Sequence, residues 1–225
     1  MNLQHNAGIT SEEIYEDLCR KIEHLEYMPG DRLSENDLCQ IYGVSRHMVR
    51  NALTGLKQRR LMDIYPQRGS YVSLIDMEYI SDILYIRESV EQEALARIME
   101  MEDRDAVIAG LKESVAAQKR LDPGPAYNEE FSQLDNAYHQ TLLSAVGKPN
   151  VMSLVAEPYI HIRRWRNYEI RTEQRMKEII GEHESLIAAI ESGDAGLARE
   201  KLHIHLDTVS RYSKALKEQE TQYFV

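Results

Sequence analysis

One carboxylate and three imidazoles occur within apolar stripes in the second half of the chain, where they could hold a divalent metal ion. Asp135 and His139 are four residues apart, so both side chains project from one face of a helix. His183 lies in a second stripe and His205 in a third. Burying four such groups is costly unless something satisfies them, and a divalent cation does so. We therefore predict a metal site made of these four residues.

Two choices define this site further. A histidine on an apolar stripe is, taken alone, more often a hydrogen-bonded core residue than a ligand. His203 and His205 point nearly opposite ways, and we choose His205 because it lies beside Leu202 and Leu206. Imidazole and carboxylate without thiolate suit zinc, nickel or another first-row ion. Four protein ligands could close a tetrahedral zinc site, whereas an octahedral ion would keep two positions open for water or a ligand.

Arg46 and Arg50 lie one turn apart at the start of a predicted helix, where they could contact DNA. Arginine suits bidentate contact with guanine and also binds phosphate. Ser45 precedes the pair as a helix N-cap, and Arg68 lies in a later turn. An isolated pair of helical arginines more often only solvates a surface, so the prediction depends on the elements around it.

The pattern around these arginines predicts a winged helix-turn-helix domain over residues 1–75. A first helix begins near residue 10. A short helix after Ser34 stops at Gly43, and a longer helix follows after a three-residue turn. Alternating residues in 61–65 and 70–74, joined by a glycine-containing loop, predict a β-hairpin.

From residue 76 onward the pattern is helical, and we predict one all-helical effector-binding and dimerisation domain over 76–225. Proline and glycine clusters mark three of its breaks, and the tail after Lys217 is expected to fray. The fold class is therefore mainly α, with an N-terminal winged helix-turn-helix and a C-terminal helical bundle. The six helices are expected near residues 77–101, 104–121, 126–146, 150–170, 172–192 and 194–217.

The composition of the chain narrows the classes of protein it can belong to. Its 225 residues allow one large domain or two small ones, and 43% hydrophobic with 28% charged residues is typical of a soluble globular protein. No apolar run approaches the ~20 residues that span a bilayer, and the first ten residues are unlike a signal peptide. Two cysteines outside any CxxC pair fit a reducing cytoplasm. We predict a cytoplasmic protein without a membrane partner.

The net charge of −10 argues at first against nucleic acid, but the charge is unevenly divided. Residues 76–225 carry 18 basic and 27 acidic side chains. Residues 31–75 carry 7 basic and 4 acidic side chains. This asymmetry fits a phosphate-binding module attached to a part that does not touch phosphate.

A known DNA-binding signature matches the N-terminal region in order and spacing. It is found in Pro29-Gly30-Asp31-Arg32-Leu33-Ser34-Glu35, in Val44-Ser45-Arg46, in Val49-Arg50 and in Arg68-Gly69. These stretches resemble the GntR family of bacterial transcription regulators. The resemblance implies that Arg46 and Arg50 read guanines and that Arg68 and Gly69 of the wing enter the minor groove. Asn36 stands where many relatives carry an arginine. The predicted DNA-contacting set is Arg32, Ser34, Asn36, Ser45, Arg46, His47, Arg50, Arg68 and Gly69.

The second part carries further recognisable stretches, namely Arg87-Glu88-Ser89-Val90-Glu91, Asp135-Asn136-Ala137-Tyr138-His139, Glu182-His183 and His205-Leu206. They resemble the FCD ligand-binding domain of the FadR subgroup, and the six-helix count resembles its shorter, VanR-like version. In metal-binding members an Asp and three His hold the ion, and these map to the four residues above. Arg87 matches the family's inward arginine, which implies that it pairs with an effector carboxylate.

Two alternatives concern the arginines of this second part. Arg87 could instead form a surface ion pair with Glu91 at i,i+4. The run Arg163, Arg164 and Arg166 could line a cavity, but a solvated face is the expected environment.

The predicted function is a homodimeric, sequence-specific transcription regulator, a repressor, whose operator binding a small organic-acid effector controls. One alternative is a metal-dependent, hydrolase-like enzyme, since an ion with open positions can activate water. No enzyme is expected, because the four coordinating residues are used as ligands and no further carboxylate lies on an inward stripe to act as a general base. A second alternative is a metal-ion sensor.

Overall fold

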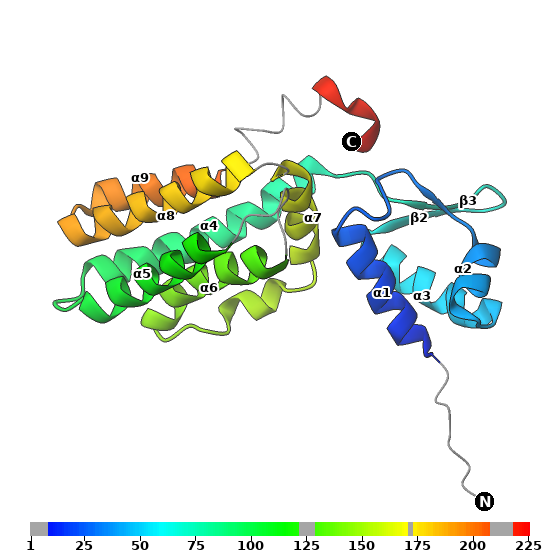
Figure 1. Cartoon of the computed structure of the whole chain (residues 1–225), viewed down its shortest axis with the longest axis horizontal. Helices are drawn as coiled ribbons and strands as arrows, with labels where there is room; N and C mark the ends of the chain where they lie inside the picture. Colours follow the sequence, from blue (N-terminus) through cyan, green and yellow to red (C-terminus); the bar gives the residue numbers. More distant parts are fainter. Residues whose placement is uncertain (1–8, 122–128, 171–172, 208–217) are drawn as a thin grey trace, which may run out of the picture. The chain divides into compact units, whose positions relative to one another are not determined.

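The protein, a computed structural model, contains two compact units (Figure 1). One unit comprises Met1–Asp76 with Glu220–Val225, and the other comprises Met77–Gln219. Nine α-helices and one three-stranded sheet lie in the part of the chain that the structure describes. That part consists of residues 9–121, 129–170, 173–207 and 218–225. Among these residues, none of the helices is both long and apolar enough to cross a membrane.

The first helix, α1 (Ser11–Glu23), begins with a capping box. The Thr10 hydroxyl accepts from the Glu13 backbone N–H at 3.1 Å, and the Glu13 carboxylate accepts from the Thr10 backbone N–H at 2.7 Å. Helix α1 buries Ile14, Leu18 and Ile22, which recur at helical spacing. This apolar face packs against α3.

The helix-turn-helix follows as the sequence predicts. Helix α2 (Glu35–Tyr42) ends at Gly43, whose φ of 66° is left-handed and favours glycine. Helix α3 (Arg46–Gln58) then starts after three residues and buries Val49 and Leu53 on its inner face. The exposed start of α3 therefore carries the two predicted guanine-reading arginines.

The wing is an antiparallel hairpin of β2 (Met62–Tyr65) and β3 (Gly69–Val72). A third strand that was not predicted, β1 (Arg32–Leu33), pairs with the other edge of β3 and places Arg32 opposite Tyr71. Two residues are too few to show an alternating pattern, so only the pairing with β3 reveals this strand. The sheet thereby ties the segment before α2 to the wing.

The end of the chain returns to the first unit. The Ile75 N–H donates to the Tyr223 carbonyl at 2.8 Å, and the Val225 N–H donates to the Ile75 carbonyl at 3.2 Å. Ile75 and Phe224 are both buried. The expectation that the tail frays was wrong for these residues, because burial of an aromatic side chain favours order. Residues 208–217 of the last predicted helix lie outside the described residues.

The second unit is all-helical. Helix α4 contacts α6, α7 and α9, while α5 contacts α6 and α8, and α8 contacts α9. These contacts link five helices into a closed ring in the order α4, α6, α5, α8 and α9, and α7 packs on α4. The bounds are α4 (Met77–Met99), α5 (Asp105–Arg120), α6 (Glu129–Ala145), α7 (Tyr159–Glu169), α8 (Glu173–Ser192) and α9 (Ala195–Leu206).

The fourth predicted helix, near 150–170, is interrupted. A short 3-10 helix, η1 (Val151–Val155), comes first, and α7 starts after Pro158. Proline has no backbone N–H to continue a helical ladder, so it stands at the start of a helix rather than inside one.

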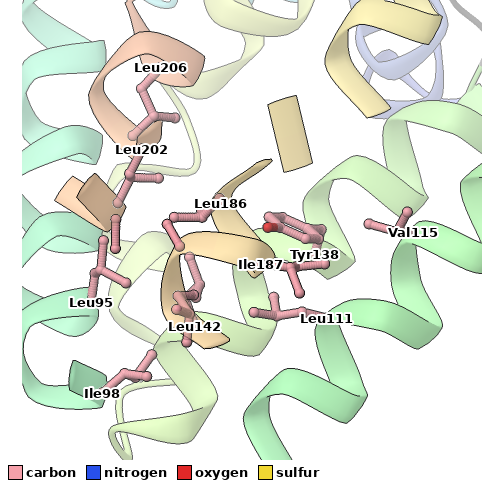
Figure 2. Close-up of a cluster of buried hydrophobic side chains, with 13 residues drawn as sticks. Leu95, Ile98, Leu111, Val115, Tyr138, Leu142, Leu186, Ile187, Leu202 and Leu206 are labelled. Atoms are coloured by element: carbon pink, nitrogen blue, oxygen red, sulfur yellow. The ribbon is translucent and has the colours of Figure 1, made fainter. Parts of the chain in front are cut away.

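A buried apolar cluster joins all five helices of the ring (Figure 2). Labelled members include Leu95 of α4, Leu111 of α5, Leu142 of α6, Leu186 of α8 and Leu202 of α9. Burial of such side chains contributes about 1.5–3 kcal/mol each, so this cluster stabilises the packing of the five helices.

The candidate ligands lie between this cluster and a second, smaller one. Phe131 and Ile179 belong to the smaller cluster. On α6, Asp135 follows Phe131 by one turn, and on α8, His183 follows Ile179 by one turn. Asp135 and His183 therefore each lie on their helix next to a residue of the smaller apolar cluster.

Candidate metal centre and nucleic-acid interface

The structure brings the four predicted metal ligands together. Asp135, His139, His183 and His205 each offer one ligand atom, and these atoms all lie within 4.8 Å of one another. His205 Nε2 lies 3.0 Å from His139 Nε2 and 3.3 Å from His183 Nε2. Asp135 Oδ1 lies 3.5 Å from His183 Nε2 and 4.0 Å from His139 Nε2. All four side chains are buried.

The opposite nitrogen of each imidazole faces a hydrogen-bond acceptor. An Nδ1 that faces such an acceptor carries the proton, which leaves the lone pair on Nε2. The Gln118 amide supports this assignment, because its Nε2 donates to the Leu134 carbonyl and so directs its oxygen to the imidazole. The acceptors are Glu91 Oε2 for His139 at 2.6 Å, Gln118 Oε1 for His183 at 2.9 Å and Glu182 Oε2 for His205 at 2.9 Å.

The converging atoms fit a cation. Three Nε2 lone pairs point into one space, and Asp135 Oδ1 is buried without a hydrogen-bond partner. Lone pairs at such separations repel one another unless a positive charge lies between them. Neighbouring ligands of a tetrahedral ion bound at about 2.0–2.1 Å lie about 3.3 Å apart, close to the separations seen here.

The ionisation states of these groups also suit ligation. Burial lowers the pKa of His139 and of His183 well below the usual range, so both imidazoles are neutral at neutral pH. Burial alone would raise the pKa of Asp135, but the charge of Arg166 lowers it below the usual value. Neutral imidazoles and an ionised carboxylate are the forms that bind metals.

The prediction that Arg163, Arg164 and Arg166 form a solvated face was wrong: Arg163 is half-buried and lines a cavity, and the other two are buried. Arg164 and Arg166 are 1% and 3% exposed. Arg166 Nη1 donates to Asp135 Oδ2 at 3.1 Å, and this contact satisfies the oxygen that faces away from the histidines. The sequence contained no local sign of this pair, whose partners lie on different helices.

A cavity of about 260 Å³ adjoins the cluster and is lined by Arg87, Glu91, His139, Tyr159 and Arg163 among others. Arg87 is buried, with Nε donating to Glu91 Oε1 and Nη1 donating to the Tyr159 hydroxyl, both at 2.6 Å. The ion pair of Arg87 with Glu91 therefore exists, but the alternative that it lies on the surface was wrong. The cavity places two arginines next to one of the candidate metal ligands.

Sequence reasoning missed the three acceptors behind the histidines. Glu91 and Gln118 are each 1% exposed, and Glu182 accepts from a buried histidine. The expectation that no further carboxylate lies on an inward stripe was therefore wrong. Glu91 was noted only as an i,i+4 partner of Arg87, and its contact with His139 crosses 48 residues. Of the two histidines of α9, His205 faces the cluster. His203 is exposed, and its imidazole bonds to Glu88 Oε1 at 2.7 Å.

The first unit presents a groove of about 620 Å³ between its helices and the wing. Ser45, His47 and Arg68, also predicted to contact DNA, are exposed but are not among its lining residues. The groove brings together the other six residues of the predicted set, Arg32, Ser34, Asn36, Arg46, Arg50 and Gly69.

Arg50 is held in place within this groove by Glu35. Its Nε donates to both Glu35 carboxylate oxygens at 3.0 Å. The pair is exposed, so it contributes little to stability. Its effect is to orient the guanidinium, and the sequence had not singled out Glu35 for this.

Gly69 allows the wing to approach Arg32 closely. Its φ is +119°, and an added Cβ would lie 2.9 Å from Arg32 Nε. We expect Gly69→Ala to cost about 1–3 kcal/mol through strain and to weaken DNA binding measured by fluorescence anisotropy. Gly181→Ala is the matched control, since its Cβ would meet nothing within 4 Å. Equal DNA affinity of the two variants would contradict a role for Gly69.

Comparisons with known proteins identify related sequences over nearly the whole chain. The family model for bacterial regulatory proteins of the gntR family matches residues 10–72, and the FCD domain model matches residues 82–208. An uncharacterized HTH-type transcriptional regulator of Streptomyces ambofaciens is 34% identical over 206 residues, which cover 92% of this chain and 86% of the relative. The HTH-type transcriptional repressor RspR of Escherichia coli is 25% identical over 214 residues, covering 95% and 93%.

Solved structures show the same fold. A GntR transcriptional regulator from a Rhodococcus species superposes with a TM-score of 0.66 at 20% identity, covering 91% of this chain and 98% of the other. Escherichia coli McbR/YncC superposes with a TM-score of 0.58 at 20% identity, covering 93% and 97%. At this identity the likeness concerns the fold alone.

Proposed function

Because the chain belongs to the GntR family of bacterial regulatory proteins and is a DNA-binding transcription regulator with an FCD domain, we propose that it is a metal-containing repressor controlled by a small carboxylate. One observation carries this proposal. The cavity beside the His3Asp cluster is lined by Arg87, by Tyr159 and by His139, which is itself a candidate ligand. A ligand in that cavity could contact the arginine and the ion together.

The proposed ion is zinc or nickel, or another first-row ion, held by Asp135, His139, His183 and His205. The converging lone pairs and the partnerless Asp135 oxygen support it. When bound, the ion supplies a buried positive charge that attracts an anion to the cavity. Glu91, Gln118 and Glu182 would orient the three imidazoles, each through its Nδ1, so that Nε2 faces the ion.

The proposed effector is a small organic acid. The cavity volume is just below the range of typical ligand pockets, so a small molecule fits better than a large one. Arg87 offers a planar fork for a carboxylate, and Arg163 adds a second positive charge to the lining.

The proposed DNA-binding form is a homodimer. Two recognition helices in a dimer would meet two half-sites about one helical turn apart, contacted through the nine residues predicted for this role. The name of the Escherichia coli relative supports repression rather than activation. We propose functional domain limits of 1–75 for DNA binding and 76–225 for effector binding and dimerisation, although the last six residues, 220–225, belong to the compact unit of the DNA-binding domain.

The hydrolase alternative has weaker support. Glu91 and Glu182 lie beside the cluster, but each already accepts from a ligand histidine at 2.6 or 2.9 Å. A carboxylate occupied in this way is poorly placed to deprotonate a water. An effector titration at constant metal concentration distinguishes the second alternative, a metal sensor. The operator complex of a metal sensor would stay intact in that titration.

The proposal is tested by screening small carboxylates for thermal stabilisation of the zinc-loaded protein. A compound that stabilises it is then titrated into the protein–operator complex and followed by anisotropy. We expect release of the wild type, with about tenfold more compound needed for Arg87→Lys, because a lysine cannot replace the charged fork. Arg97→Lys, a change at an exposed arginine of α4, should respond like the wild type. Equal responses of the two variants would remove Arg87 from the effector site.

A further inference from the structure

Glu91 touches both the candidate effector arginine and a candidate metal ligand. Its Oε1 accepts from Arg87 Nε at 2.6 Å, and its Oε2 accepts from His139 Nδ1 at 2.6 Å. Arg87 and Glu91 are each 1% exposed and His139 is 4% exposed. All three line the same cavity. One buried carboxylate therefore shares its charge between the cavity and the metal centre.

Glu182 has the same arrangement on the other side of the cluster. Its Oε1 accepts from Arg175 Nη1 at 3.1 Å, and its Oε2 accepts from His205 Nδ1 at 2.9 Å. Arg175 also contacts Glu169 and Glu178. Among the described residues that line the cavity, neither Glu182 nor its arginine is present. This second bridge is a natural internal control for the first.

We propose that Glu91 is a positioning residue that couples occupancy of the cavity to metal affinity. The proposal rests on the metal and effector sites proposed above. In the structure, the negative charge of Glu91 offsets the positive charge of the Arg87 guanidinium. A carboxylate ligand bound to Arg87 would take over part of that role. The freed negative charge of Glu91 then acts more strongly on the His139 N–H and makes that imidazole a better ligand. Effector and metal therefore strengthen each other's binding.

The coupling is reciprocal by thermodynamic necessity. If a carboxylate in the cavity raises metal affinity by some factor, the metal raises the affinity for that carboxylate by the same factor. The protein would then release its operator at a lower effector concentration when the metal is bound. Arg175 and Glu182 keep His205 oriented whatever the cavity contains, because the charge of Arg175 is offset by carboxylates outside the cavity.

The test uses zinc alone and needs no effector. Removal of Arg87 mimics the offset of its charge, so zinc affinity is measured for two double-mutant cycles of the full chain by competition with a chromophoric chelator. The first cycle combines Arg87→Gln with Glu91→Gln, and the second combines Arg87→Gln with Glu182→Gln. Each glutamate change alone should lower zinc affinity about 10–100-fold. Arg87→Gln alone should raise it severalfold.

The two cycles should differ. When Glu91 is already changed to Gln, the increase in zinc affinity caused by Arg87→Gln should be at least about threefold smaller than in the wild type. When Glu182 is changed to Gln instead, that increase should stay within about twofold of its wild-type size. Circular dichroism checks that each variant is folded. If Arg87→Gln does not fold, Arg87→Lys replaces it, since the lysine keeps the charge but breaks the Nε contact. A smaller effect of the same sign is then expected.

Additive behaviour of Arg87 and Glu91 would overturn the inference, as would an equally large coupling of Arg87 to Glu182, because the effect would then be a general electrostatic one. These results differ from a failure of the proposed function. If the wild type binds no zinc, the metal site itself is wrong and the inference falls with it. If the wild type binds zinc and His183→Ala abolishes that binding, but the two cycles give the same coupling, then only the role of Glu91 is refuted.

Discussion

His183→Ala will leave the purified protein with almost no metal, whereas His203→Ala will retain close to one divalent ion per chain, as four protein ligands imply. His183 is fully buried, with Nε2 3.3 Å from His205 Nε2 and 3.5 Å from Asp135 Oδ1. Loss of a direct ligand costs more than the roughly 10–100-fold loss typical of outer partners. Elemental analysis of the two variants and the wild type measures the difference.

His203→Ala is the matched control because its imidazole lies on the same helix as His205 but faces away from the cluster. It is 55% exposed and bonds to Glu88. If His203→Ala loses the ion and His205→Ala keeps it, the helical-face argument fails. A second readout is stability, since zinc at about 1,000 times its Kd should stabilise the wild type by about 4 kcal/mol and His183→Ala by far less.

Arg50→Ala and Arg46→Ala will each weaken binding to the specific operator by about 1–3 kcal/mol and relax base preference. Both arginines line the groove of the first unit, and Arg50 is already oriented there by Glu35. A bidentate guanidinium contact with guanine supplies discrimination of this size. Fluorescence anisotropy with the operator and with single-base variants of it measures both quantities.

Arg97→Ala is the control for Arg50→Ala. Arg97 is also an exposed arginine in an ion pair, with Glu93, but it lies on α4. It should leave operator affinity unchanged, and Arg68→Ala in the wing should weaken binding evenly across sequences. Unchanged operator affinity of Arg50→Ala would remove α3 from the role of recognition helix.

Local patterns accounted for most of the elements. The structure confirms the first helix that was predicted to begin near residue 10, since α1 starts at Ser11 after its N-cap Thr10. Gly43 marked the turn between α2 and α3 because its left-handed backbone favours glycine. These features are readable because each depends on residues within one or two helical turns. Strand β1 escaped prediction because its pairing partner is far along the chain.

Part of the candidate site could likewise be predicted from local patterns, and part of it could not. Asp135 and His139 share a helical face by their spacing alone, and the choice of His205 over His203 follows from the stripe around it. The burial of Arg164 and Arg166 could not be predicted locally, because their charge suggested an exposed face but the fold buries both side chains. Arg166 pairs with the buried carboxylate of Asp135. Asp135 lies on α6, 31 residues away in the sequence, so this pairing cannot be read from the residues around Arg166.

Local patterns thus predict the helical class, the winged helix-turn-helix and the inward faces of Asp135, His139, His183 and His205. Long-range packing brings these faces to one point, sets Glu91, Gln118 and Glu182 behind the histidines and forms the cavity beside Arg87. The difference lies in the range over which each interaction acts. Helical periodicity and capping act over three or four residues, whereas the contacts that orient His139 and His183 join residues 48 and 65 positions apart.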